Sequence, residues 1–247
     1  MIKYSVCLDA VFNGKDIYDS INAVHEAGIS TIEFWDYSSK DLNKLSDTMN
    51  TLGMNVSTFC MKPTGLNDKN KHQQFIDDLN EAIEVAKKLN ADRLITLVGN
   101  DTGEKREVQH ENILTCIDMA IPYLEAGKFT MMLEPLNILV DHMGYYLYSS
   151  AEAFDIVNKV NNPFVKIIFD IYHQQITEGN LINNITKNIG NIAHFHTAGN
   201  PGRHELNIGE INYPEIFKAI EKTNYSGYIG LEYFPVGDNK QSLKELP

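Results

Sequence analysis

The chain has 247 residues, of which 43% are hydrophobic and 22% charged, and its formal net charge is -12. This size and composition are typical of one globular domain with a large apolar core, and they match a single (β/α)8 barrel. The negative charge argues against nucleic acid as a partner, because a phosphate backbone would be repelled.

Eight short apolar runs, rich in Ile, Val, Leu and Phe, are distributed along the whole chain. Such runs predict strands that are covered on both faces. The predicted strands are Tyr4–Leu8, Thr31–Phe34, Asn55–Phe59, Arg93–Leu97, Thr130–Leu133, Val165–Phe169, Ile192–His196 and Tyr228–Leu231.

Amphipathic segments between these runs predict helices. The first has an apolar stripe from Ile17 that Gly28 ends, and two later stripes span 75–89 and 113–124. Ser149 and Glu152 have the spacing of a capping box, and Pro214 suits the first turn of a helix. The weakest predicted helix covers Leu181–Asn188.

Strand and helix therefore alternate eight times, which predicts an α/β fold with a parallel sheet. Eight units in this length favour a closed barrel over an open sheet, and no G-x-G-x-x-G follows the first strand. We expect residues 1–247 to form a single TIM barrel with its site at the C-terminal ends of the strands.

The cysteines Cys7, Cys60 and Cys116 are few and widely spaced, so no disulfide framework is expected, and Cys7 and Cys60 are predicted to be buried thiols. No segment has the pattern of a signal peptide or a membrane span. The expected location is the cytoplasm, with no membrane partner.

Charged residues and histidines close four consecutive predicted strands. Glu134, Asp170 and Glu232 follow strands five, six and eight, and strand seven carries His194 and His196 on one face. Each residue alone has an ordinary structural explanation, such as a helix cap for Asp170 or a core histidine for His196. Their coincidence at one end of a barrel favours a functional site.

A divalent cation would relieve the repulsion among three acids placed beside an apolar core. Carboxylates with one imidazole suit Mn²⁺ or Mg²⁺, and also Co²⁺ or Zn²⁺. We therefore predict one metal ion held by Glu134, Asp170, His196 and Glu232.

Further polar residues are expected around this centre. His173 lies three residues after Asp170, and Arg203 and Glu205 lie in the loop NPGRHE after strand seven. We predict that His173, Arg203, His194 and Glu205 bind the substrate, with Arg203 suited to a carboxylate or a run of hydroxyls. The aromatic residues Trp35, Phe12 and Phe59 are candidates for the pocket wall, although packing is their commoner role.

Glu134 and Glu232 would approach a bound substrate from different strands. A small hydroxy-carbonyl compound can chelate a cation, which stabilises the charge formed when an α-proton leaves. One glutamate can remove that proton to give a cis-enediolate, and the other can return it. This predicts an isomerase or epimerase with no organic cofactor.

The segments MLEPLN, FDIYHQQITEGNL, NIAHFHTAGNPGRHELNIGEINY and GYIGLEYFPVGD resemble the xylose isomerase-like TIM barrels, the sugar isomerase/epimerase superfamily. Within that family, the chain looks most like the hydroxypyruvate isomerases. The resemblance implies the same four metal ligands, Glu134 and Glu232 as the acid/base pair, His173 and Arg203 at the substrate, and a homodimer or homotetramer.

Two positions depart from the hydroxypyruvate isomerase pattern. His196 stands where those enzymes typically have Gln, as in the ketose 3-epimerases, and Phe234 stands where they commonly have Lys. The substrate is therefore left open among hydroxypyruvate or tartronate semialdehyde, a related keto acid and a free ketose. A ketose 3-epimerase, a decarboxylase or lyase, a sugar-binding barrel, and an endonuclease IV-like DNA repair enzyme remain as alternatives.

Overall fold

The strands form one closed parallel barrel in the computed structural model, which describes residues 2–247. Each strand pairs with the next in sequence, and the first pairs with the last. The strands are β1 (Tyr4–Cys7), β2 (Thr31–Phe34), β3 (Asn55–Cys60), β4 (Arg93–Thr96), β5 (Thr130–Leu133), β6 (Val165–Asp170), β7 (Ile192–Thr197) and β8 (Ile229–Leu231). All eight predicted strands are confirmed, with ends that differ by one residue at most.

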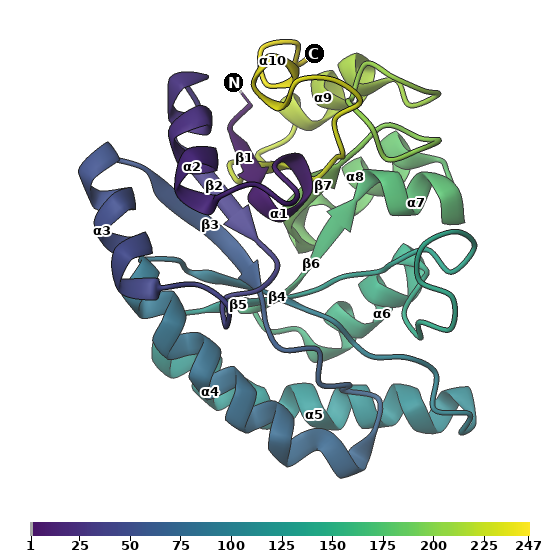
Figure 1. The fold of residues 1–247 in the computed structure, drawn as a ribbon. Helices are drawn as coiled ribbons and strands as arrows, with labels where there is room; N and C mark the ends of the chain where they lie inside the picture. The colour runs from purple at the N-terminus through teal and green to yellow at the C-terminus, as the bar shows by residue number, and fades with distance from the viewer. Residues whose placement is uncertain (1) are drawn as a thin grey trace.

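Helices surround the barrel (Figure 1), and the first and last strands pair where the barrel closes. The helices are α1 (Leu8–Val11), α2 (Ile17–Glu26), α3 (Leu42–Leu52), α4 (His72–Leu89), α5 (Arg106–Gly127), α6 (Ser150–Val160), α7 (Ile171–Thr177), α8 (Leu181–Asn188), α9 (Tyr213–Glu221) and α10 (Asn239–Ser242). Short 3₁₀ turns cover Lys69–Lys71 and Ile189–Asn191. The fold is therefore the (β/α)8 barrel that the sequence predicts.

The ends of several helices follow the sequence signals. Pro214 lies in the first turn of α9, and α8 has the bounds expected from its pattern. At α6 the capping box is incomplete: the Ser149 hydroxyl accepts a hydrogen bond from the Ala151 amide, but the Glu152 carboxylate pairs with Arg106. A tertiary ion pair has replaced the local contact that the spacing predicts.

The barrel interior is divided by polarity. Ile95, Met132 and Ile168 fill the side formed by β4, β5 and β6. The side formed by β2 and β7 instead contains Glu33 and His194, both fully buried. Apolar residues usually fill such an interior. A buried acid and a buried histidine on one side of it are therefore unusual.

Among residues 2–247, no helix is both long and apolar enough to cross a membrane. The three cysteines are free, as expected, with Cys7 and Cys116 buried. The prediction of a buried thiol is wrong for Cys60, which is partly exposed because it lines the cavity described below.

Candidate active site

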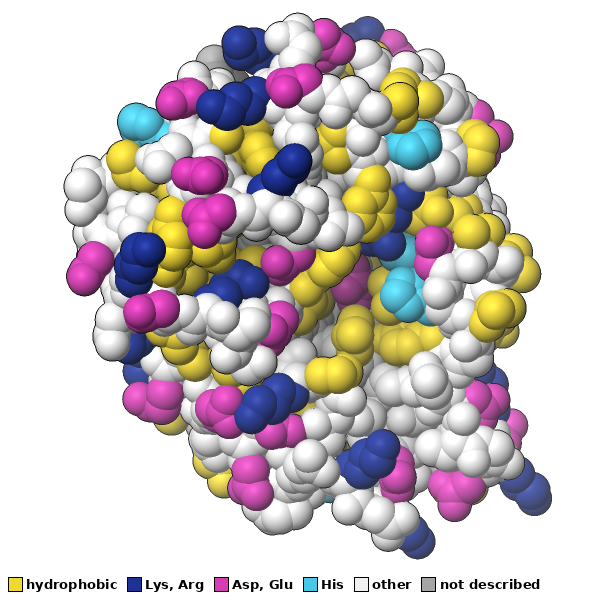
Figure 2. Space-filling view, viewed as in Figure 1, with side chains coloured by type: hydrophobic (Ala, Val, Ile, Leu, Met, Phe, Trp, Pro, Cys, Tyr) yellow, Lys and Arg dark blue, Asp and Glu magenta, His cyan; other side chains and the backbone are white. Residues whose placement is uncertain are grey.

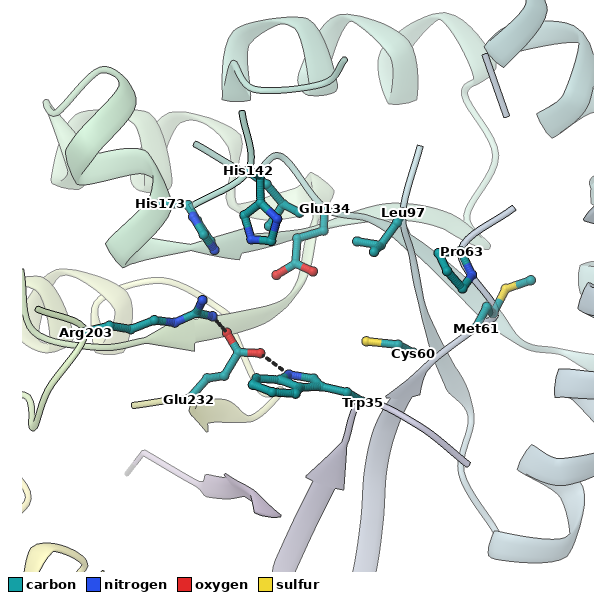
Figure 3. Close-up of a pocket in the computed structure, with 11 residues that line it drawn as sticks. Trp35, Cys60, Met61, Pro63, Leu97, Glu134, His142, His173, Arg203 and Glu232 are labelled. Carbon is teal, nitrogen blue, oxygen red and sulfur yellow. Dashed lines mark hydrogen bonds and ion pairs between the residues drawn. The ribbon is translucent and has the colours of Figure 1, made fainter. Parts of the chain in front are cut away.

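A cavity of about 320 Å³ lies at the C-terminal ends of the strands. Figure 2 shows it as a hollow with acidic side chains recessed inside it and hydrophobic and histidine side chains around its edge. The residues that line it are Trp35, Cys60, Met61, Pro63, Leu97, Glu134, Leu136, His142, His173, Arg203 and Glu232 (Figure 3). The loops after β2, β3 and β4 supply a mainly apolar wall, and the loops after β5 to β8 supply the charged and imidazole groups.

The four predicted metal ligands form one cluster at the polar side of this cavity, which Glu134 and Glu232 line and Asp170 and His196 do not. Glu134 follows β5, Asp170 ends β6, His196 lies near the end of β7, and Glu232 follows β8. One potential ligand atom from each lies within 4.8 Å of the others, and all four residues are buried. Residues separated by up to about a hundred positions in sequence thus form one compact cluster.

The imidazole of His196 links the carboxylates of this cluster. Its Nδ1 lies 3.1 Å from Oε1 of Glu134 and 3.5 Å from Oε2 of Glu232. Burial opposes a charge on this ring, but Glu232 and Glu33 outweigh burial and raise the pKa of His196 well above its usual value. The negative charge of the cluster is therefore what favours a cation here.

The pKa values of the three acids shift in different directions. Burial and the neighbouring Glu232 raise the pKa of Asp170 to about 6. Burial also raises the pKa of Glu134. At Glu232 burial is outweighed by His196 and Arg203, which lower the pKa to about 2.

Three buried carboxylates and one imidazole nitrogen fit a divalent cation such as Mn²⁺, Mg²⁺, Co²⁺ or Zn²⁺. The absence of a cysteine from this set distinguishes it from a structural zinc site. A second group of potential ligands, Glu33, His194 and His196, shares the imidazole with the first.

Asp170 has a structural role as well. Its Oδ1 accepts a hydrogen bond from the backbone amide of His173 and so caps the first turn of α7. The helix-cap explanation and the ligand explanation of Asp170 are compatible, because a carboxylate can use its two oxygens for different partners.

His173 presents a hydrogen-bond donor to the cavity. Its Nδ1 accepts a hydrogen bond from the backbone amide of Asn137 at 3.3 Å and also lies 2.6 Å from the Asn137 side-chain nitrogen. This assigns the ring proton to Nε2, which is buried without a hydrogen-bond partner among the described residues. Burial and Arg203 lower the pKa of His173 well below its usual value, so the ring is neutral.

Arg203 and Trp35 both contact the carboxylate of Glu232. The guanidinium of Arg203 donates to Oε2, and the indole Nε1 of Trp35 donates to Oε1 at 2.6 Å (Figure 3). Arg203 also lies over the rings of Tyr172 and Phe234, with its carbon Cζ 5.4 and 5.9 Å from their centroids. These contacts hold the Glu232 carboxylate and the Arg203 guanidinium at one edge of the cavity.

Two of the predicted substrate-binding residues do not line the cavity. His194 is fully buried inside the barrel, where its Nε2 lies 2.8 Å from Oε2 of Glu33. Glu205 accepts hydrogen bonds from the Val236 amide at 3.1 and 3.2 Å and so ties the loop after β7 to the loop after β8. Both residues therefore lie outside the lining of this cavity, and their role in substrate binding stays a prediction.

Of the aromatic candidates, Trp35 lines the cavity, whereas Phe12 and Phe59 belong to the hydrophobic core. Sequence reasoning missed Glu33 and Asn137. The available signal for Glu33 was an acid in the middle of the short apolar run TIEF. Asn137 carried no local signal beyond its place in the loop after Glu134.

The protein is thus a TIM barrel that carries a cluster of acids and one histidine at the ends of four consecutive strands. The chain belongs to the xylose isomerase-like TIM barrel family, whose sequence profile matches residues 21–246.

The similar proteins cover nearly the whole chain. Hydroxypyruvate isomerase of Escherichia coli (strain K12) is 29% identical over 99% of this chain and 98% of its own. The 2-oxo-tetronate isomerase of Pectobacterium atrosepticum is 29% identical over 98% of this chain and 96% of its own. The crystal structure of an AP endonuclease, family 2, from Brucella melitensis superposes with a TM-score of 0.94 at 29% identity, over 98% of this chain and 97% of its own.

Proposed function

We propose that this protein is a divalent-metal-dependent isomerase of a small keto acid of the hydroxypyruvate or 2-oxo-tetronate type. The observation that carries the proposal is the cluster of Glu134, Asp170, His196 and Glu232 at the cavity. The names of the two full-length relatives supply the substrate class.

The residues around the cavity could supply the groups that such a reaction needs. A metal ion in this cluster would act as a Lewis acid toward the oxygens of the substrate. Glu134 and Glu232 enter the cavity from different strands. One of them takes the α-proton to leave a cis-enediolate, and the other returns a proton to the adjacent carbon.

The remaining polar groups bind and orient the substrate. The Nε2–H of His173 has no hydrogen-bond partner among the described residues, although it lies 3.6 Å from Oδ2 of Asp170, and it can donate to a substrate hydroxyl or carbonyl oxygen. Among residues 2–247, Arg203 is the single Lys or Arg side chain that lines the cavity, so it is our candidate for the substrate carboxylate. The apolar wall formed by Met61, Pro63 and Leu97 limits access of water to the reacting carbons.

A ketose 3-epimerase is the second candidate, since it would use the same proton transfers. It is favoured by Phe234, which packs near Trp35 and Arg203 at the position where the hydroxypyruvate isomerases commonly carry Lys. An acid substrate would then have one fewer cation to bind it. A requirement for a carboxylate in the substrate separates the two candidates.

The similarity to the Brucella AP endonuclease structure raises DNA repair as a third possibility. The charge of this chain is -12, and Figure 2 shows Lys and Arg interspersed with Asp and Glu around the hollow rather than gathered at it. A protein that binds the phosphate backbone needs a continuous basic face. We therefore place DNA repair below the isomerase and the epimerase.

The test is proton NMR of the metal-loaded protein in D₂O with hydroxypyruvate, 2-oxo-tetronates and unphosphorylated ketoses. We expect deuterium to enter the α-carbon of a keto acid, and we expect Glu134→Gln and Glu232→Gln each to abolish this exchange. Glu26→Gln, on the outer helix α2, is the matched control because Glu26 is exposed and pairs with Lys240.

Exchange retained in either active-site variant would remove that residue from the acid/base pair. Exchange with ketoses alone would favour the epimerase. Consumption of a keto acid with release of CO₂ and without exchange into recovered substrate would replace the isomerase by a decarboxylase.

A further inference from the structure

Glu33 is a buried carboxylate that the proposed reaction does not use. It lies on β2 inside the barrel, is 1% exposed, and does not line the cavity. Its Oε2 accepts a hydrogen bond from the Ser57 hydroxyl at 3.1 Å and lies 2.8 Å from Nε2 of His194. A carboxylate in this position is costly unless it is paired and hydrogen-bonded, so its contacts need a physical explanation.

The second oxygen of Glu33 connects it to the metal cluster. Its Oε1 lies 2.9 Å from Nε2 of His196, an ion-pair contact without the alignment of a hydrogen bond, while Nδ1 of the same ring faces Glu134 and Glu232. An imidazole that binds a cation through one nitrogen keeps its proton on the other, and a carboxylate partner there fixes the ring orientation. Glu33 occupies that partner position.

The backbone leaves room for this arrangement at Gly230 on β8. A Cβ atom added to Gly230 would lie 2.5 Å from Oε1 of Glu33, 2.6 Å from Cδ2 of His196 and 2.9 Å from Nε2 of His194. Any side chain at this position would therefore displace all three groups.

Strand irregularities also coincide with the network. The pairing of β2 with β3 shifts register between Ile32 and Glu33, and the pairing of β6 with β7 shifts just before the pair Ile168–His194. Such irregularities next to active sites redirect side chains. Here they accompany the inward placement of Glu33 and His194.

We propose that Glu33, supported by His194, is a positioning residue that holds His196 with Nδ1 directed at the metal position and Nε2–H directed into the barrel. This inference rests on the proposed metal-dependent function. Glu33 does not contact the substrate, so its effect is on the affinity and the geometry of the metal centre.

The experiment compares the wild type with Glu33→Gln, a variant of the same shape, by calorimetric titration with Mn²⁺ and by the visible absorption spectrum of the Co²⁺-loaded protein. We expect Glu33→Gln to weaken Mn²⁺ binding by about 10- to 100-fold, as is usual when such a partner is lost. We also expect a shift of the Co²⁺ bands, because the imidazole ligand is reoriented. Far-UV circular dichroism checks the fold of each protein.

A second pair of variants tests His194. His194→Gln keeps a side-chain N–H that can reach Glu33, whereas His194→Met removes it. We expect the Met variant to bind Mn²⁺ more weakly than the Gln variant. His72→Gln is the matched control: His72, the first residue of α4, is also buried, but its Nε2 contacts the backbone carbonyl oxygen of Leu66.

The outcomes separate this inference from the proposed function. No Mn²⁺ or Co²⁺ binding by the folded wild type would overturn the metal centre itself, and the positioning role with it. Binding by the wild type together with unchanged affinity and Co²⁺ spectrum in Glu33→Gln would overturn the role of Glu33 alone.

Discussion

At the scale of single residues, the site depends on how a few charges are paired. Glu232 keeps its charge while buried because Arg203, His196 and Trp35 all stabilise the ionised form. His173 is neutral for the opposite reason, since burial disfavours its charged form. Charged partners in the first case and burial in the second thus give an ionised carboxylate and a neutral imidazole within one cavity.

Replacement of Arg203 tests whether its guanidinium binds the carboxylate of an acid substrate. We expect Arg203→Met to lower kcat/KM for an acid substrate by roughly 30-fold or more, because removal of one partner of a buried ion pair costs about 2–5 kcal/mol. Arg203→Lys should lose less, since it keeps the charge but not the planar fork. Steady-state kinetics provides the measurement.

Arg106→Met is the control for Arg203, because Arg106 pairs with Glu152 away from the cavity. Equal losses for acid substrates and neutral ketoses in Arg203→Met would show that Arg203 acts through Glu232 and not by binding a carboxylate.

Trp35→Phe tests the hydrogen bond from the indole to Glu232. The variant keeps an aromatic wall but removes the donor at 2.6 Å. A hydrogen bond to a charged group is worth about 1.5–3 kcal/mol, so we expect kcat to fall by roughly 10-fold or more, and Mn²⁺ to bind more weakly because Glu232 is also a predicted metal ligand. A kcat equal to that of the wild type would show that this bond does not contribute to the reaction.

At the scale of elements, the sequence signals for strands and helix ends are mostly local. Apolar runs predicted every strand, because both faces of each strand are buried. The short helices Leu8–Val11 and Ile171–Thr177 escaped prediction, since each begins directly after a strand and has too few residues to show a period. Asp170 illustrates the difficulty, because one residue ends a strand and caps a helix.

Helix α2 offers a test of local stabilisation. The Asp16 carboxylate accepts hydrogen bonds from the amides of Tyr18 and Asp19 at 2.8 and 3.1 Å. We expect Asp16→Ala to lower the free energy of unfolding by about 1 kcal/mol without affecting activity, as urea denaturation would measure. Asp19→Ala, in the first turn of the same helix, should cost less, and equal losses would contradict the capping role.

At the scale of the whole molecule, metal binding and folding should be coupled. The repulsion among Glu134, Asp170 and Glu232 is present only when the barrel brings them within 4.8 Å. A ligand that binds the folded state at 100 times its Kd stabilises it by about 2.7 kcal/mol. For a chain of this size we therefore expect Mn²⁺ to raise the Tm by roughly 5–10 °C.

Differential scanning fluorimetry with Mn²⁺, Mg²⁺, Co²⁺ and Zn²⁺ measures this shift, and a chelator should reverse it. Asp170→Asn is the matched variant, because it keeps an oxygen that can cap α7 but loses the charge. A Tm of the wild type that none of the four ions changes would argue against the metal centre. The homodimer or homotetramer that the family resemblance implies stays a prediction.

The sequence by itself determined the alternation of strands and helices, the barrel, and the acids and histidine at the strand ends. These features follow from patterns of a few residues, because burial of a strand or a helix face is a local property. The tertiary structure alone decided which groups meet. Glu33 reaches His194 across 161 positions, and Asn137 reaches His173 across 36. Such pairs depend on barrel closure and on register shifts that turn side chains inward, and no local pattern records them.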